Sequence, residues 1–195
     1  MATEEPAFKL VSEEGAFSVR EYPALVAAEV TVPGDHDAAA SAGFRLLAGY
    51  IFGGNSPRQR IAMTAPVVQE PAADGEKIAM TTPVTQSGGP GSWTVRFMMP
   101  SGYTLETLPK PNDPRVKLLV LPPSRVAVVR FSGLAGADEV ARQTGMLGDF
   151  MARKKMRASG PASLARYNPP WTLWFMRRNE VMIPIEQSAS KTAKP

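Results

Sequence analysis

Few residues of this 195-residue chain could carry out chemistry, and the missing types exclude several mechanisms. The chain has no cysteine and a single histidine, His36, which excludes disulfides, thiolate catalysis, iron–sulfur clusters and metal sites built from several histidines. A Ser-His-Asp relay would have to run through His36. Because Asp35 and Asp37 flank that histidine in a predicted helix-start turn, we expect it to lie on the surface. The motifs of serine hydrolases, phosphate-binding loops, dinucleotide-binding folds and zinc proteases are also missing.

The carboxylates are scattered and give little support to acid–base catalysis. Glu180 ends the run Arg177-Arg-Asn-Glu180, where we expect a structural Arg–Glu pair that holds the last strand. The other groups that an active site could use are Glu21, Tyr22 and Tyr50. The close carboxylate pairs lie in predicted turns or chain ends and are expected to be solvated; they are Glu4/Glu5, Glu13/Glu14 and Asp35/Asp37.

Basic and apolar side chains gather at a few places. The net charge of +4 is too small to indicate nucleic-acid binding. The densest basic run, Arg153–Arg157, is at or just after the end of a predicted helix, where cations complement the helix dipole; a phosphate- or membrane-binding patch is the alternative. Nine of the ten methionines lie in or next to predicted elements and are expected to fill an irregular core, with a plastic pocket wall as the alternative. An aromatic segment near the C-terminus is expected to close the core, although flat apolar ligands also suit such walls; it contains Tyr167, Trp171, Trp174 and Phe175.

The elements that must position these residues are mostly strands. Period-two alternation predicts a strand over 17–22, and β-branched and alanine-rich composition predicts one over 25–32. Apolar spacing predicts a helix over 35–51 that Asp35 or Asp37 caps. Gly53 and Gly54 end that helix. A local repeat predicts two further strands over 61–67 and 78–84, joined by a turn at Asp74-Gly75. The remaining predicted elements are strands over 93–99, 116–121, 125–131, 172–176 and 181–185 and a helix over 137–151.

A shift of 100 residues places the second set of elements on the first. Pro23, Val26 and Ala27 then fall on Pro123, Val126 and Ala127, and the two predicted helices coincide. Each half reads as strands, then a helix, then strands, which is typical of an α+β sheet with helices on one face. We therefore expect one domain over residues 10–186, with half-repeats at about 15–99 and 115–185 and flexible tails at 1–9 and 187–195.

The composition is that of a folded protein. Apolar residues make up 44% of the chain, enough to bury a sizeable core. No run of the sequence reaches the roughly 18 apolar residues that a membrane helix needs. The N-terminus lacks the basic and apolar regions of a signal peptide. A cytoplasmic monomer without membrane or nucleic-acid partners is expected, unless a leader has been removed.

Several motifs together resemble the SOUL haem-binding protein family over about residues 15–185. They are Tyr50-Ile-Phe-Gly-Gly-Asn55, the doubled Ile-Ala-Met-Thr-x-Pro-Val, Tyr167-Asn-Pro-Pro-Trp171 and Arg177-Arg-Asn-Glu-Val-Met-Ile-Pro184. The alanine-rich character is similar to that of bacterial members. The resemblance implies a distorted β-barrel of two pseudo-symmetric halves, each a sheet flanked by one main helix. It also implies reversible, non-covalent binding of haem or a related tetrapyrrole.

The resemblance further implies a shallow apolar groove beside the first helix. In this sequence the groove residues are Ser41, Phe44, Arg45, Leu47, Ala48 and Gly49, with Met63 on the neighbouring strand. One branch of the family has a proposed iron-ligating histidine where this chain has Glu21. The basic residues that another branch offers to the haem propionates fall on Ser41 and Gly49, which leaves Arg45 as the substitute. We therefore expect apolar stacking, weak or no axial ligation by the protein, and no metal-ligating residue.

Three functions stay open at this point. The first is a carrier or buffer of haem or another tetrapyrrole. The second is an effector-binding module for another planar hydrophobic ligand or a protein partner, because the same barrel resembles bacterial effector-binding domains. The third is an enzyme that acts on a tetrapyrrole or a small hydrophobic substrate. The sequence favours a binding protein over an enzyme, because no catalytic motif is present.

Overall fold

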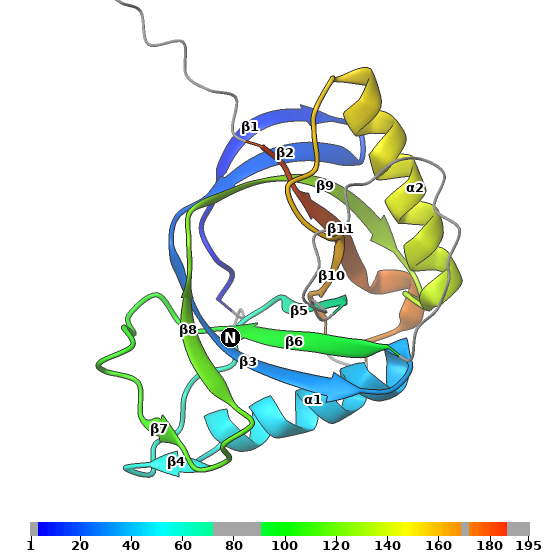
Figure 1. Ribbon diagram of the computed structural model, residues 1–195. Coiled ribbons are helices and arrows are strands. Elements are labelled where there is room, and N and C mark those ends of the chain that lie inside the picture. The colour runs from blue at the N-terminus through cyan, green and yellow to red at the C-terminus, as the bar shows by residue number, and fades with distance from the viewer. Residues whose placement is uncertain (1–3, 72–90, 169–171, 187–195) are drawn as a thin grey trace, which may run out of the picture.

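The computed structural model describes residues 4–71, 91–168 and 172–186. A nine-stranded antiparallel sheet curls into a ring, and two helices pack on its outside (Figure 1). The strand order is β1-β2-β9-β11-β10-β5-β6-β3-β8, and a short second sheet pairs β4 with β7. The prediction of an α+β distorted barrel is confirmed. The strands are β1 Lys9–Glu14, β2 Phe17–Tyr22, β3 Leu25–Pro33, β4 Asn55–Ser56, β5 Val67–Pro71, β6 Ser92–Met98, β7 Lys110–Pro111, β8 Lys117–Leu121, β9 Ser124–Ser132, β10 Ser163–Arg166 and β11 Arg178–Pro184.

Each helix covers one part of the outer face. Helix α1, His36–Ile51, packs on β3 and β6, and helix α2, Ala137–Arg153, packs on β9 and β11. Asp35 caps α1 by accepting hydrogen bonds from the backbone N–H groups of Asp37 and Ala38. Helix α1 lies so close to β6 that a Cβ at Gly43 would come within 2.6 Å of Val95 Cγ2. Two apolar clusters therefore form, one under each helix.

The inner face of the sheet carries a third cluster, because successive residues of a strand point to opposite faces. On β9, Val126 and Val128 face inward while Ala127 and Val129 face α2. Strand β11 alternates in the same way, with Met182 inside and Val181 under α2. The two sides of the sheet are thus chemically separate layers.

Two predicted strands are wrong. Residues 61–66 form no strand; the ladder begins at Val67. Their backbone groups bond elsewhere: Ile61 N–H donates to Ile51 O and Ala65 N–H donates to Glu4 O. Residues 172–176 form a turn that ends in the 3-10 helix η1, Trp174–Met176.

The aromatic segment also differs from expectation. Leu173, Trp174, Phe175 and Met176 are exposed and do not close the core, whereas Tyr167 is half-buried and packs against the inner-face cluster as expected. Their turn is closed by two backbone hydrogen bonds, from Met176 N–H to Leu173 O and from Arg177 N–H to Trp174 O. The predicted strand 78–84, the turn at Asp74-Gly75 and Trp171 lie outside the described residues. In the part of the chain that the structure describes, no helix has the length and apolar character to span a membrane.

Candidate functional site

The residues predicted for the groove gather on or beside α1, at different depths. Leu47 is completely buried under the helix, in the cluster between α1 and the sheet. Phe44 is half-buried, with its ring 5.4 Å from that of Phe97. Met63 is half-buried and packs against the same cluster. Leu47 therefore supports the helix from below, and it offers no surface to a ligand.

The exposed face of α1 is formed by residues spaced three or four apart. Ser41 and Arg45 are exposed on it, and Ala48 is half-buried. Phe52, the residue that ends the helix, continues this face with 58% of its surface exposed. Gly49 leaves open space beside the face, because a Cβ there would contact nothing within 4 Å. Phe52 is not among the residues predicted for the groove, although it follows Ala48 by four positions in the sequence.

Three exposed arginines lie on this face or in the segment that follows it. Arg45, Arg58 and Arg60 are exposed, and none forms a hydrogen bond or ion pair with a described residue. The segment that carries the last two folds back onto the helix end, because the Asn55 amide donates to Tyr50 O and Gln59 O. Within that fold, a Cβ at Gly53 would lie 3.2 Å from Arg58 Nε. The C-terminal part of α1 and the segment after it thus combine exposed apolar surface with positive charges that have no partner among the described residues.

His36 is not on the surface as expected; only 8% of it is exposed. Its ring packs edge-on against Trp93, with the ring centroids 5.2 Å apart. Its Nδ1 lies 2.9 Å from Asp37 Oδ1, and its Nε2 has no hydrogen-bond partner among the described residues. The first turn of α1 packs against β6, so the ring is directed inward while the flanking carboxylates stay outside.

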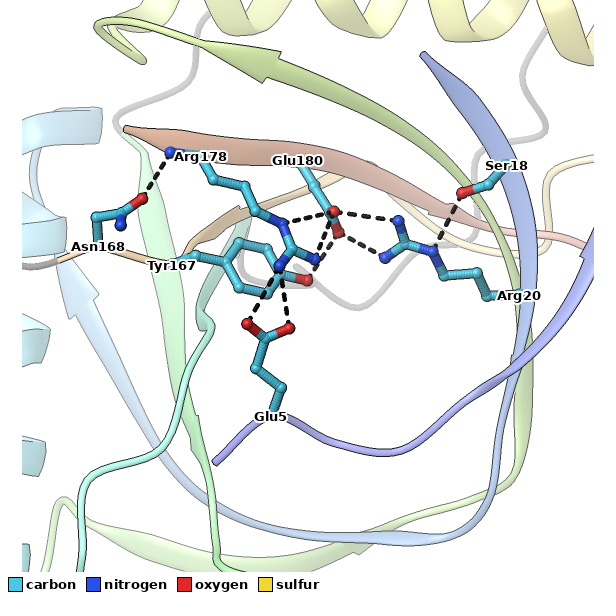
Figure 2. A network of polar contacts seen from close by, with 7 residues as sticks. All are labelled: Glu5, Ser18, Arg20, Tyr167, Asn168, Arg178 and Glu180. Carbon is cyan, nitrogen blue, oxygen red and sulfur yellow. Dashed lines mark hydrogen bonds and ion pairs between the residues drawn. The ribbon is translucent and has the colours of Figure 1, made fainter. Parts of the chain in front are cut away.

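A second group of polar residues lies on the inner face of the sheet (Figure 2). Arg20 on β2 donates to both oxygens of Glu180 on β11, at 2.7 and 3.1 Å. Arg178 donates from Nε and Nη2 to Glu180 Oε1 at 3.2 and 3.0 Å. Tyr167 donates its hydroxyl to Glu180 Oε2 at 2.7 Å. The structural Arg–Glu pair expected for Glu180 is present, and the distant Arg20 adds a partner that no local motif indicated.

These contacts shift the pKa values of Glu180 and Tyr167. Burial alone would raise the pKa of Glu180, but the hydrogen bonds from Arg20 and Tyr167 and the charges of Arg20 and Arg178 outweigh it and lower the pKa. For Tyr167, burial and the neighbouring Glu180 charge both raise the pKa. Glu180 is therefore a carboxylate whose lone pairs are already used, which makes it a poor general base.

The other groups weighed for catalysis are also engaged. Glu21 forms ion pairs with Lys9 at 3.7 Å and with Arg125 at 2.9 Å. Tyr50 donates its hydroxyl to Pro109 O at 2.9 Å, and burial raises its pKa to about 12. Burial likewise raises the pKa of Tyr22. Among residues 4–71, 91–168 and 172–186, no group of three or more His, Cys, Asp or Glu side chains could hold a metal ion.

Comparison with known proteins gives one family and several similar folds. The family described as SOUL heme-binding protein matches residues 3–184. No curated protein matches the chain. The crystal structure of the EcmrR C-terminal domain is similar, with a TM-score of 0.65, 10% identity, and coverage of 88% of this chain and 98% of that one.

Two further structures share the fold. EcmrR in its DNA complex has a TM-score of 0.64 and 10% identity over 88% of this chain, which spans 57% of that one. A structure described as a hydrolase from Listeria innocua has a TM-score of 0.55 and 13% identity, covering 95% of this chain and 94% of that one. At these identities the likeness concerns the fold alone.

Proposed function

Because this chain belongs to the SOUL heme-binding protein family, we propose that it binds haem or a related tetrapyrrole non-covalently on the exposed face of α1 and acts as a carrier or buffer. The observation that carries the proposal is the exposed Phe52 at the end of α1, with Arg45 on the same helix face and Arg58 and Arg60 in the segment that follows. None of the three arginines has a partner among the described residues. A tetrapyrrole with propionates is a flat apolar ring with two carboxylates at one edge, so it needs both kinds of surface.

The apolar part of this surface supports stacking of the ring. Phe52 projects from the helix end, and Phe44 and Ala48 lie half-buried on the neighbouring turns. Covering such surface contributes about 25 cal/mol for each Å² of apolar area removed from water. The open space at Gly49 lets a flat ligand approach the helix backbone.

The arginines support recognition of the propionates. A guanidinium can donate two parallel hydrogen bonds to one carboxylate. Arg45, Arg58 and Arg60 are exposed, so each contact contributes about 0.2–1 kcal/mol and weakens in salt. They therefore set the orientation of the ligand more than its affinity.

The iron has no imidazole ligand on this face. His36 begins α1 and Phe52 ends it, a separation of about 24 Å along the helix axis. The ring of His36 is also buried against Trp93. The residues present thus fit the porphyrin ring and its propionates, and binding should depend little on the metal.

The test is a titration of the purified protein with hemin and with metal-free protoporphyrin IX, followed by the Soret band and by tryptophan fluorescence. We expect saturable one-to-one binding of both, weakened at least tenfold in Phe52→Glu. Phe175→Glu is the matched control, because Phe175 is 55% exposed on η1, which contacts β9, whereas Phe52 ends α1, which packs on β3 and β6. Phe44→Asp is less suitable, because it would also remove the contact with Phe97.

The two alternatives give different results in the same assay. Equal weakening in Phe52→Glu and Phe175→Glu would place binding elsewhere and contradict the proposed face. Saturable binding of planar hydrophobic cations, with neither porphyrin bound, would instead support an effector-binding module. Turnover of a bound tetrapyrrole would support an enzyme, although the groups considered for catalysis are already engaged in hydrogen bonds, ion pairs or burial.

A further inference from the structure

The segment that precedes β1, Glu4–Phe8, lies along the inner face of the sheet, and we call it the N-terminal strap (Figure 1). Glu4 anchors one side: its backbone oxygen accepts from Ala65 N–H and its carboxylate accepts from Ser101 N–H, each at 2.9 Å. Phe8 anchors the other side, 4.5 Å from the Arg20 guanidinium. The strap thus connects two sides of the ring of strands.

Between these anchors, Glu5 reaches the polar side chains on the inner face of the sheet, which we call the inner polar group: Arg20, Tyr167, Arg178 and Glu180. Both of its carboxylate oxygens lie 3.1 Å from Arg178 Nη1 (Figure 2). Other residues hold that guanidinium in place, because its Nε and Nη2 bond to Glu180 and its carbon lies 3.8 Å from the centre of the Tyr167 ring. The Nη1 group of Arg178 therefore points in the same direction whether or not Glu5 is present.

The charges of the inner polar group favour an anion beside Arg178 Nη1. Arg20 and Arg178 carry two positive charges against one negative charge on the fully buried Glu180. The Glu5 carboxylate supplies the missing negative charge. Without Glu5, Arg20 and Arg178 would share the single negative charge of Glu180, and the group would carry one positive charge in excess.

A pocket of about 260 Å³ adjoins the strap, and Glu5 is part of its wall. Its volume is below the roughly 300 Å³ at which pockets for drug-sized ligands begin. The opposite wall is largely apolar and comes from the start of β3 and the segment after β6: Pro23, Leu25, Val26, Met99 and Tyr103. Glu5 is thus shared between this largely apolar pocket and the ion pair with Arg178.

We propose that Glu5 occupies a carboxylate-binding site on the inner face of the barrel, and that a small monocarboxylate with a short apolar body binds at Arg178 when the strap moves away. Glu5 acts as a tethered substitute for the carboxylate of the ligand. Its side chain is 42% exposed and that of Arg178 is 25% exposed, so the ion pair is weak enough to exchange. This site goes beyond the tetrapyrrole face of α1 and shares none of its residues.

The test compares the wild type with Glu5→Ala, using 3-phenylpropionate as the probe and NMR titration as the readout. If the strap is closed in about nine of ten molecules, removing its carboxylate lowers the dissociation constant about tenfold. The matched control is Glu13→Ala, which removes the same charge from an exposed position on β1. The neutral amide, 3-phenylpropanamide, should bind to none of these proteins.

A double variant tests whether the geometry of the Arg178 guanidinium matters for binding. Glu5→Ala/Arg178→Lys retains the positive charge but loses the fork geometry, so it should lose the gain in affinity. The proposal is overturned if Glu5→Ala binds the probe no more tightly than Glu13→Ala, or if the amide binds as well as the acid. Thermal midpoints within a few degrees of the wild type establish that each variant is folded. Hemin binding by Glu5→Ala should be unchanged, which separates this site from the tetrapyrrole face.

Discussion

Replacing Glu180 by glutamine tests whether charge holds the inner polar group together. The substitution keeps the size of the side chain and removes the negative charge between Arg20 and Arg178. It also places an amide donor where both oxygens now accept hydrogen bonds. Because Glu180 is 0% exposed and Arg20 is 7% exposed, water has little access to the charge left on Arg20.

The expected loss in the free energy of unfolding follows from the positive charge that remains buried. Removing one partner of a buried ion pair costs about 3–5 kcal/mol, because the other charge is left without compensation. Arg20 is buried and loses its carboxylate, whereas Arg178 keeps Glu5. We therefore expect Glu180→Gln to lower the free energy of unfolding by about 3 kcal/mol, the lower end of that range.

Urea denaturation followed by tryptophan fluorescence measures this change as a lower midpoint at constant slope. Glu13→Gln is the control, because Glu13 is exposed on β1, and its midpoint should not move. A loss smaller than about 1 kcal/mol in Glu180→Gln would refute the reasoning, since that is the size expected of an exposed pair.

The same variant should change the response to acid. Since the folded protein lowers the pKa of Glu180, its contribution to stability is present above the unfolded value of about 4.3 and is lost as the pH falls below it. Glu180→Gln removes this contribution, so its free energy of unfolding should fall less between pH 6 and pH 3 than that of the wild type. An identical fall in both proteins would mean that Glu180 does not contribute to acid sensitivity.

Three further predictions concern α1. Gly43→Ala should lower the free energy of unfolding by about 1–3 kcal/mol in urea denaturation, because the added methyl meets Val95 at 2.6 Å; no loss would show that the helix can shift. Asp35→Ala should cost about 1 kcal/mol in the same assay through the lost N-cap, whereas Asp35→Asn should restore most of it. Tyr50 should ionise at about pH 12 in an absorbance titration. Because that folded pKa is raised above the unfolded value of about 10, stability should decline as the pH rises above 10, and less so in Tyr50→Phe.

The pattern of apolar residues in the sequence was sufficient to predict a strand and the helix that packs on it. The predicted strand over 25–32 and helix over 35–51 have apolar residues at the spacing of the observed β3 and α1. Residues 61–66 have the same alternation but bond to Ile51 and Glu4, which are distant in the sequence. Alternation reports which side of a segment is buried, and it does not identify the partner strand.

The inner polar group shows the same limit at the level of side chains. The run Arg177-Arg-Asn-Glu180 indicated a local Arg–Glu pair, and Arg178 fulfils it. The shortest ion-pair contact of Glu180 is instead with Arg20, 160 residues earlier in the chain, because β9 pairs with both β2 and β11. No local pattern can indicate a contact that depends on strand order.

The alternation of β11 separates the two proposed sites. Val181 and Ile183 face α2, while Glu180 and Met182 face the interior, so the sheet itself lies between the inner polar group and the helices. The face formed by Phe52 and Arg45 is on the outer side of the sheet. Substitutions that share no contacts have additive free energies within about 0.5 kcal/mol. A Phe52→Glu/Glu5→Ala protein should therefore show the hemin affinity of one single variant and the 3-phenylpropionate affinity of the other. Coupling larger than that limit would mean that the N-terminal strap and α1 move together.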